Sequence, residues 1–140
     1  MATRATICIQ NDDMTVTGVY CHNDGYLDHN GQILQDNYTD EESVRALIEL
    51  GNLSVLGSTP EETFAYGRDR GDKGQEAVTG STWRSFIHDR GQEYNYIFVV
   101  GEGWYVDKDG GYIRDLEGAL GDEDGDEDED ENDWDEEDDN

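Results

Sequence analysis

The residues of this 140-residue sequence that could carry out chemistry are concentrated in one short segment. His22, Asp24, Asp28 and His29 fall within eight residues, and both side-chain types bind metals and transfer protons. Their spacing matches no established ligand pattern, and Asp is also a common turn residue. We therefore expect no metal site, no cofactor and no catalytic residue here.

Other catalytic motifs are also not expected. Asp107–Gly111 begins like a calcium loop, but Tyr112 stands where Gly is required and Gly118 where the closing Glu is required. The sequence contains no phosphate-binding P-loop motif, and no Cys or Ser lies in a recognisable nucleophile motif. We predict that the chain is not an enzyme.

A run of carboxylates at the end of the sequence is the strongest chemical signal. Fifteen of the twenty residues from Gly121 to Asn140 are Asp or Glu, and none is Lys or Arg. They carry −15 of the formal net charge of −27, which leaves −12 for residues 1–120. An extended chain, at ~3.3 Å per residue, would space these charges ~4.4 Å apart, close to the ~3.4 Å of a single DNA strand.

Mimicry of a DNA duplex would need a second acidic row, from a second subunit or from the domain surface. A candidate row lies in the first third of the chain: Asp12, Asp13, Asp24, Asp28, Asp36, Asp40, Glu41 and Glu42.

The predicted partner-binding residues are the tail carboxylates and one tryptophan that partners could bury. They are Asp122, Glu123, Asp124, Asp126, Glu127, Asp128, Glu129, Asp130, Glu131, Asp133, Trp134, Asp135, Glu136, Glu137, Asp138 and Asp139. The alternative is that the tail only keeps the protein in solution and that a lone exposed tryptophan has no partner.

The charge balance argues against direct binding to nucleic acid or to anionic membranes. Nine Lys and Arg face thirty-six Asp and Glu, and basic residues supply most affinity for phosphate. The longest apolar run, Ile97–Val100, is far shorter than the ~20 residues of a membrane span. The N-terminal residues have no hydrophobic signal region behind them, so we expect a cytoplasmic protein in which Cys8 and Cys21 stay reduced and buried.

The sequence predicts an opening β-hairpin. Thr3–Gln10 alternates apolar and polar residues, with every second residue from Ala5 to Ile9 on one face, and Thr15–Cys21 is rich in β-branched residues. The expected register places Cys8 near Val16 and far from Cys21, which also disfavours a disulfide.

Three helices are expected. A short one lies between Leu27 and Tyr38, and the next is capped by Thr39, with Glu42 completing a capping box and Gly51 ending the helix. The third spans Ser81–Asp89.

The remaining segments complete a small sheet. Thr63–Tyr66 is expected to form a short strand, Tyr94–Val100 a central strand buried on both faces, and Trp104–Val106 the last strand. Asn52–Pro60 and Gly67–Gly80 are expected to be loops. The predicted fold class is α+β: one domain over residues 1–116, with a largely antiparallel sheet of four to five strands and about three helices, followed by a disordered acidic tail over residues 117–140.

Tyr66–Gly71 contains two of the nine basic residues, Arg68 and Arg70. The segment could be an anion-binding loop, but two interpretations are favoured over it: local ion pairs, or an intramolecular contact for the acidic tail.

Several segments resemble a family of small uncharacterised proteins of tailed bacteriophages. The likeness rests on Tyr20–Tyr26 (YCHNDGY), Leu47–Gly57, Tyr66–Gly71 (YGRDRG), Tyr94–Phe98 and Gly103–Val106, and it covers most of residues 1–106. The long acidic tail departs from the usual family member. The resemblance implies a phage origin and action in the cytoplasm of the bacterial host, but no established activity.

Charge and resemblance together predict a phage-encoded DNA mimic that inhibits a host defence or DNA-processing protein. Its partner would be a DNA-binding protein with a basic groove, such as a nuclease, a CRISPR effector, a polymerase or a topoisomerase. A homodimer is compatible with this prediction. The alternatives are an accessory or structural phage protein with a solubilising tail, and a chaperone-like shield of a basic partner.

Overall fold

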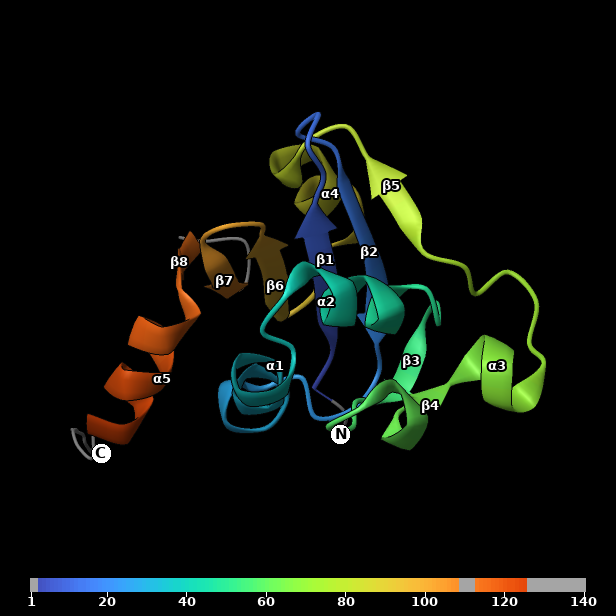
Figure 1. The fold of residues 1–140 in the computed structure, drawn as a ribbon, viewed down its shortest axis with the longest axis horizontal. Coiled ribbons are helices and arrows are strands. Elements are labelled where there is room, and N and C mark those ends of the chain that lie inside the picture. The colour runs from blue at the N-terminus through green and yellow to red at the C-terminus, as the bar shows by residue number, and fades with distance from the viewer. Residues whose placement is uncertain (1–2, 109–112, 126–140) are drawn as a thin grey trace.

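The fold is built on one mixed sheet with helices on both of its faces (Figure 1). The computed structural model describes residues 3–108 and 113–125. Within these residues eight strands pair in the order β4-β3-β2-β1-β6-β7-β8, and β5 pairs with β2 outside this path. Of the pairings, β1–β6 and β2–β3 are parallel and the other five are antiparallel. The α+β prediction is confirmed, although the sheet has more strands than the predicted four to five.

The strands are β1 (Ala5–Gln10), β2 (Val16–Cys21), β3 (Leu53–Val55), β4 (Phe64–Ala65), β5 (Val78–Gly80), β6 (Tyr94–Val99), β7 (Gly103–Lys108) and β8 (Ile113–Asp115). The α-helices are α1 (Gln32–Asn37), α2 (Glu41–Ile48), α3 (Tyr66–Arg70), α4 (Trp83–Arg90) and α5 (Leu116–Gly125). A π-helical turn, η1 (Leu27–Gly31), precedes α1, and a 3₁₀ turn, η2 (Pro60–Glu62), precedes β4.

The additional strands are short. β3, β5 and β8 have three residues each, and the first two lie in the segments Asn52–Pro60 and Gly67–Gly80 that were predicted to be loops. The second of these segments also holds most of helix α3. Three residues show less than two periods of strand alternation, so these strands depend on their neighbours in the sheet and leave little local signal.

The opening hairpin forms, but its predicted register is wrong by two residues. Gln10 pairs with Val16, so Cys8 faces Gly18. The connection covers residues 11–15 and is closed by a 2.8 Å hydrogen bond from the Asn11 N–H to the Thr15 carbonyl, so the second strand begins at Val16 and not at the predicted Thr15. Both Cys8 and Cys21 are buried free thiols, as expected.

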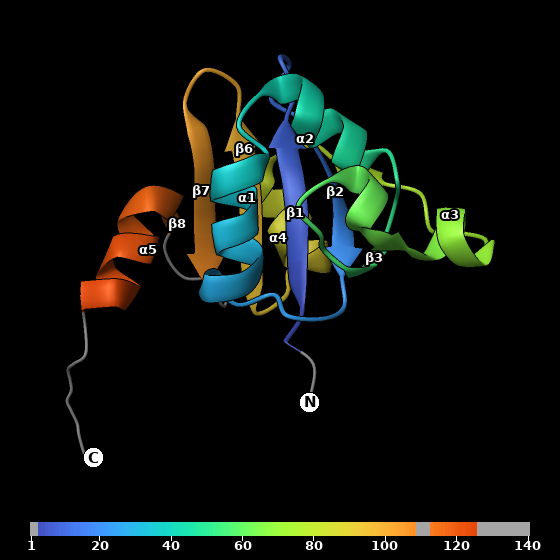
Figure 2. The same ribbon diagram turned by 60° about the horizontal axis from the view of Figure 1, so that its bottom comes forward.

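Strand alternation divides the apolar side chains between two cores. Ala5, Ile7 and Ile9 face the larger core, which η1, α1, α2 and α5 cover, while Cys8 and Ile97 face a smaller core against α4 (Figure 2). Residues Asn95 to Phe98 of β6 are all buried, which confirms the prediction of a central strand buried on both faces.

Helix α5 carries regular structure past the predicted end of the domain at residue 116. Leu116, Ala119 and Leu120 are buried in the larger core, and α5 packs against η1 and β7. Their i, i+3, i+4 spacing is the pattern of a buried helix stripe, which the surrounding carboxylates obscured in the sequence. The folded domain therefore includes at least Leu116–Leu120.

Helix α2 begins one residue later than predicted. Its N-cap is Asp40 and not Thr39, because the Asp40 Oδ1 atom accepts a 2.9 Å hydrogen bond from the Ser43 N–H. This bond, with the Ser43 side chain, holds the pKa of the Asp40 carboxyl below its usual 3.8.

The Asp40 cap predicts a pH-dependent contribution to stability. A lowered folded-state pKa stabilises the fold above pH 3.8, and this stabilisation is lost as the pH falls through the lowered value. Asp40→Ala should therefore lower the urea midpoint at pH 7, and its difference from the wild-type protein should shrink below pH 3.8. Asp40→Asn is the matched control, because its amide oxygen can cap the helix without titrating. An Asp40→Ala effect that does not change with pH would contradict the assigned cap.

Candidate functional site

Carboxylates are concentrated on the side of the sheet that η1, α1 and α2 cover (Figure 2). The exposed acidic residues of these helices and their caps are Asp28, Asp36, Asp40, Glu41, Glu42 and Glu49. The carboxylates of α2 are exposed because the opposite stripe of this helix, formed by Val44, Leu47 and Ile48, is buried against the sheet.

Arg45 brings two more carboxylates to this side. Its Nε atom lies 2.8 Å from Glu41 Oε2, and its Nη1 donates a 3.1 Å hydrogen bond to Asn11 Oδ1. The second contact holds the β1–β2 turn, which carries the exposed Asp12 and Asp13, beside α2.

We call this surface the acidic helix face: Asp12, Asp13, Asp28, Asp36, Asp40, Glu41, Glu42 and Glu49. Arg45 is the single Lys or Arg of the segments that form it. The structure thus groups seven of the eight residues of the predicted second acidic row. The eighth, Asp24, lies instead in the crossover between β2 and η1.

The opposite side of the sheet has mixed charge. Helix α4, capped by Thr82, exposes Arg84, His88, Asp89 and Arg90. The sheet therefore separates an acidic surface from one that contains cations, a polarity that the linear sequence does not show.

Helix α5 joins the acidic helix face to the predicted binding tail. It packs against η1 and α1 in the same layer, with Glu117 exposed. Of the predicted partner-binding residues, Asp122, Glu123 and Asp124 belong to this helix. The others lie outside the described residues: Asp126, Glu127, Asp128, Glu129, Asp130, Glu131, Asp133, Trp134, Asp135, Glu136, Glu137, Asp138 and Asp139.

The segment Tyr20–Tyr26 contains two of the four residues of the Asp- and His-rich turn, His22 and Asp24, and it has structural roles at most of its positions. The Nδ1 atom of His22 forms a 2.6 Å hydrogen bond with the Tyr20 hydroxyl. The Nδ2 atom of Asn23 donates a 3.0 Å hydrogen bond to the carbonyl of Ser54, which lies in β3. Asp24 has a positive φ of 60°, which Asp tolerates better than most residues.

Gly25 allows this segment to cross the start of β1. Its N–H donates to the Thr3 carbonyl at 2.8 Å, and its carbonyl accepts a 2.7 Å hydrogen bond from the buried Tyr96 hydroxyl. Burial raises the pKa of Tyr96 above its ordinary value, so this hydroxyl stays a donor. A Cβ atom at position 25 would lie 2.7 Å from the Ala5 Cβ, so only glycine fits without movement.

No chemical centre forms around the two histidines in the described residues. His29 Nδ1 lies 3.1 Å from Asn30 Oδ1, whereas His22 bonds to Tyr20. The described part of the chain contains no group of three or more His, Cys, Asp or Glu residues that could hold a metal ion.

The other segments singled out in the sequence also have local partners. Arg68 Nε lies 3.0 Å from Asp69 Oδ1, and Arg70 Nη2 lies 2.7 Å from Asp72 Oδ2, which confirms local ion pairs, one of the two favoured interpretations. Asp107 belongs to strand β7 and is buried, which is not the geometry of a calcium loop. Burial raises the pKa of the Cys8 and Cys21 thiols, so neither is an activated nucleophile.

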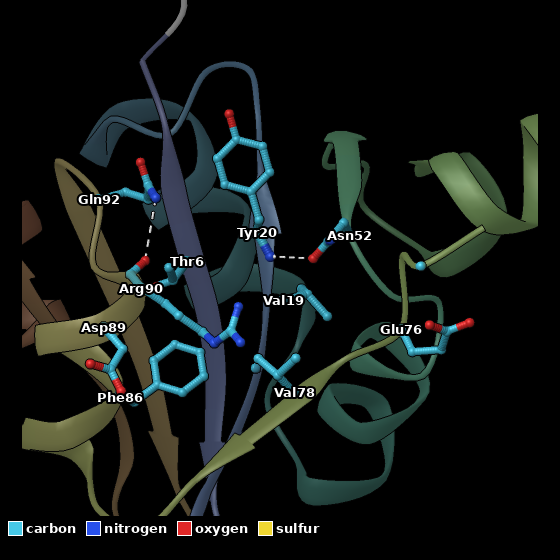
Figure 3. A pocket seen from close by; sticks show the side chains of 12 residues that line it. Thr6, Val19, Tyr20, Asn52, Glu76, Val78, Phe86, Asp89, Arg90 and Gln92 are labelled. Atoms are coloured by element: carbon cyan, nitrogen blue, oxygen red, sulfur yellow. Dashed lines mark hydrogen bonds between the residues drawn. The ribbon is translucent and has the colours of Figure 1, made fainter. Parts of the chain in front are cut away.

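A pocket that the sequence does not suggest lies on the α4 side of the sheet (Figure 3). It has a volume of about 330 Å³, and we call it the β2–α4 pocket. Its lining comes from β1, β2, the residue before β3, the segment that leads into β5, and α4 with the residues after it: Thr6, Gly18, Val19, Tyr20, Asn52, Gly74, Glu76, Val78, Phe86, Asp89, Arg90 and Gln92. Residues so far apart in the chain form no motif, so only the folded structure could reveal this pocket.

Comparison with known proteins found no matching family model, curated protein or solved structure. The resemblance to a phage family therefore stays a prediction. Within the described residues, no helix has the length and apolar character needed to cross a membrane.

The close approach at Gly25 predicts a specific stability effect. Gly25→Ala should destabilise the protein by about 1–3 kcal/mol, since the added methyl group would meet the backbone of Arg4 and Thr3 at 3.0 Å. Gly121→Ala is the matched control, because position 121 lies in α5 with nothing within 4 Å of an added Cβ. The control should stabilise the helix slightly, by up to about 1 kcal/mol. Urea unfolding followed by circular dichroism would measure both, and equal midpoints for Gly25→Ala and the wild-type protein would refute the crossover geometry.

Proposed function

We propose that this protein is a non-catalytic DNA mimic that occupies the basic DNA-binding channel of a host defence or DNA-processing protein. The acidic helix face is the observation that carries the proposal. It gathers eight carboxylates and one arginine on one side of the sheet, in the layer from which α5 leads into the acidic tail.

The acidic helix face adds the charge density that the tail alone lacks. The tail has roughly the charge spacing of one DNA strand, whereas a duplex carries about one charge per ~1.7 Å of its axis. A second set of carboxylates on a folded surface raises the local charge density toward that of a duplex. A basic channel would then attract the protein from a distance, with an association rate that falls as salt increases.

The resemblance to phage proteins adds a biological setting to this proposal. A phage-encoded inhibitor would act in the bacterial cytoplasm against a nuclease, a CRISPR effector, a polymerase or a topoisomerase. This proposal requires both acidic surfaces for binding. The competing hypothesis is that the tail only keeps the protein in solution.

Capture from a bacterial lysate by the tagged full-length protein tests this proposal. The captured protein should bind DNA, should be released by duplex DNA or high salt, and should lose its DNA-dependent activity when the purified inhibitor is added. Two full-length variants separate the surfaces: one neutralises the twelve acidic residues after Gly125, and the other is Asp28→Asn, Glu42→Gln, Glu49→Gln. Each should weaken capture and inhibition.

The matched control removes three charges from the other side of the sheet, with Glu76→Gln, Asp89→Asn and Glu93→Gln. It should bind as the wild-type protein does, apart from a small effect of net charge. If the control and the face variant weaken binding equally, only total charge matters and the proposed surface is incorrect. If the tail variant retains full capture and inhibition, the tail is a solubiliser.

A further inference from the structure

The β1–β2 turn carries a bulky side chain at a position that favours glycine. Met14 has a φ of 74°, and in the described part of the chain it shares a positive φ with only one other non-glycine residue, Asp24. This left-handed conformation crowds the Cβ atom, so Gly or Asn is the usual residue there, and hairpins with short loops commonly use Gly. A methionine therefore makes this turn less stable than a glycine would.

Hydrogen bonds around Met14 hold the turn in this conformation. The Met14 N–H donates to the Asn11 carbonyl at 2.9 Å, and the Asn11 N–H donates to the Thr15 carbonyl at 2.8 Å. Asp13 Oδ1 accepts a 3.1 Å hydrogen bond from the Thr15 N–H and a 2.6 Å bond from the Thr15 hydroxyl. The Arg45 side chain joins the turn to α2 through Asn11. None of these bonds uses the Met14 side chain, so the turn is a rigid support whose shape does not depend on it.

The Met14 side chain adds little to the stability of the domain. It belongs to neither core, and with 60% of its surface exposed it is the most exposed large hydrophobic residue in the part of the chain that the structure describes. Its sulfur, a weak acceptor, lies 3.7 Å from Gln10 Nε2. Met14 thus combines a strained backbone with exposed apolar surface, and strain of this kind is commonly kept at functional sites.

The surroundings of Met14 indicate the chemistry of a partner. Asp12 and Asp13 directly precede it, and both are exposed members of the acidic helix face. Because β1 and β6 are parallel neighbours, the β6–β7 turn leaves the same end of the sheet, and it exposes Val100 and Glu102 (Figure 2). An apolar side chain bordered by carboxylates is complementary to an apolar recess bordered by cations.

We propose that Met14 is an anchor residue for the protein partner of the acidic helix face, inserted into an apolar recess of a basic surface. This inference rests on the proposed function and adds to it a contact that charge cannot supply. A channel that binds DNA contacts base edges, partly through apolar groups, as well as phosphates. Methionine is unbranched and flexible, so it can fill an irregular recess. The carboxylates would then speed association, and Met14 would slow dissociation.

The first measurement compares the stability of the full-length wild-type protein with that of two variants. Met14→Gly and Met14→Asn both tolerate a positive φ, and both remove the exposed apolar side chain. Each variant should unfold in urea at the wild-type midpoint or above it, because the strain is relieved and no core contact is lost. Lower midpoints for both variants would show that the side chain stabilises the domain itself, which would overturn the proposal.

The second measurement is binding to the purified protein that the wild-type chain captures, followed by surface plasmon resonance over a range of salt concentrations. Both Met14 variants should bind roughly tenfold more weakly, mainly through faster dissociation, with an unchanged dependence on salt. Phe64→Thr removes another exposed apolar side chain, on the edge strand β4, and as the matched control it should bind like the wild-type protein. The variant Asp28→Asn, Glu42→Gln, Glu49→Gln should instead slow association and weaken the salt dependence.

The outcomes separate this inference from the proposed function. Equal affinity of the Met14 variants and the wild-type protein would overturn the anchor and leave DNA mimicry intact. A captured partner that does not bind DNA, but is released by salt and binds the Met14 variants weakly, would support the anchor and contradict DNA mimicry. Capture of no partner would overturn both. A wild-type dimer in sedimentation that Met14→Gly abolishes would assign the residue to contacts between two copies, which would also overturn the proposal.

Discussion

The parallel pairing of β1 with β6 is the constraint on which the rest of the structure depends. Ala5 lies beside Tyr94 and Gln10 beside Val99, so strands 89 residues apart in the chain form the centre of the sheet. Parallel neighbours cannot be joined by a tight turn, so a long connection must separate the two strands in the chain. A buried 2.8 Å hydrogen bond from the Thr6 hydroxyl to Asn95 Oδ1 fixes the two strands side by side. Asn95 also donates to the Gln92 and Asp107 carbonyls, which extends this polar connection to β7.

The same central pairing explains the distribution of charge. The helices η1, α1, α2 and α5 share the larger core, and α4 alone packs on the smaller one. The carboxylates of the first group of helices are therefore exposed on the same side of the sheet, however far apart they stand in sequence. The contact between Arg45 and Asn11 adds the hairpin turn to that side. A surface with this one-sided charge can be recognised by a basic partner, whereas the same residues scattered evenly would only raise the net charge.

Polar residues near the sheet mainly satisfy the backbone where strands are interrupted. Asn52 replaces a strand neighbour for Tyr20 and holds Gln75, and the Trp104 indole donates a 2.7 Å hydrogen bond to the Tyr38 carbonyl in the larger core. The Tyr20–Tyr26 segment has the same role, since its residues hydrogen-bond to the backbone where the segment crosses the start of β1. Residue types associated with catalysis thus serve here to close a sheet whose edge strands are short, and the β2–α4 pocket is the space that this arrangement leaves open.

The sequence by itself determined the strongly periodic elements, which are the opening hairpin, α2, α4, the strands β6 and β7, and the α+β class. Local alternation and helix spacing are properties of consecutive residues, so they can be found without a structure. The sequence also determined the charge excess and the acidic run after Gly121. Tertiary structure alone decided the three-residue strands, the shift of the hairpin register and the placement of Leu116 and Leu120 in the core. It also decided which carboxylates share a face and which distant residues line a pocket. These features depend on contacts between segments far apart in the chain, whose free energy appears only when the sheet brings the segments together.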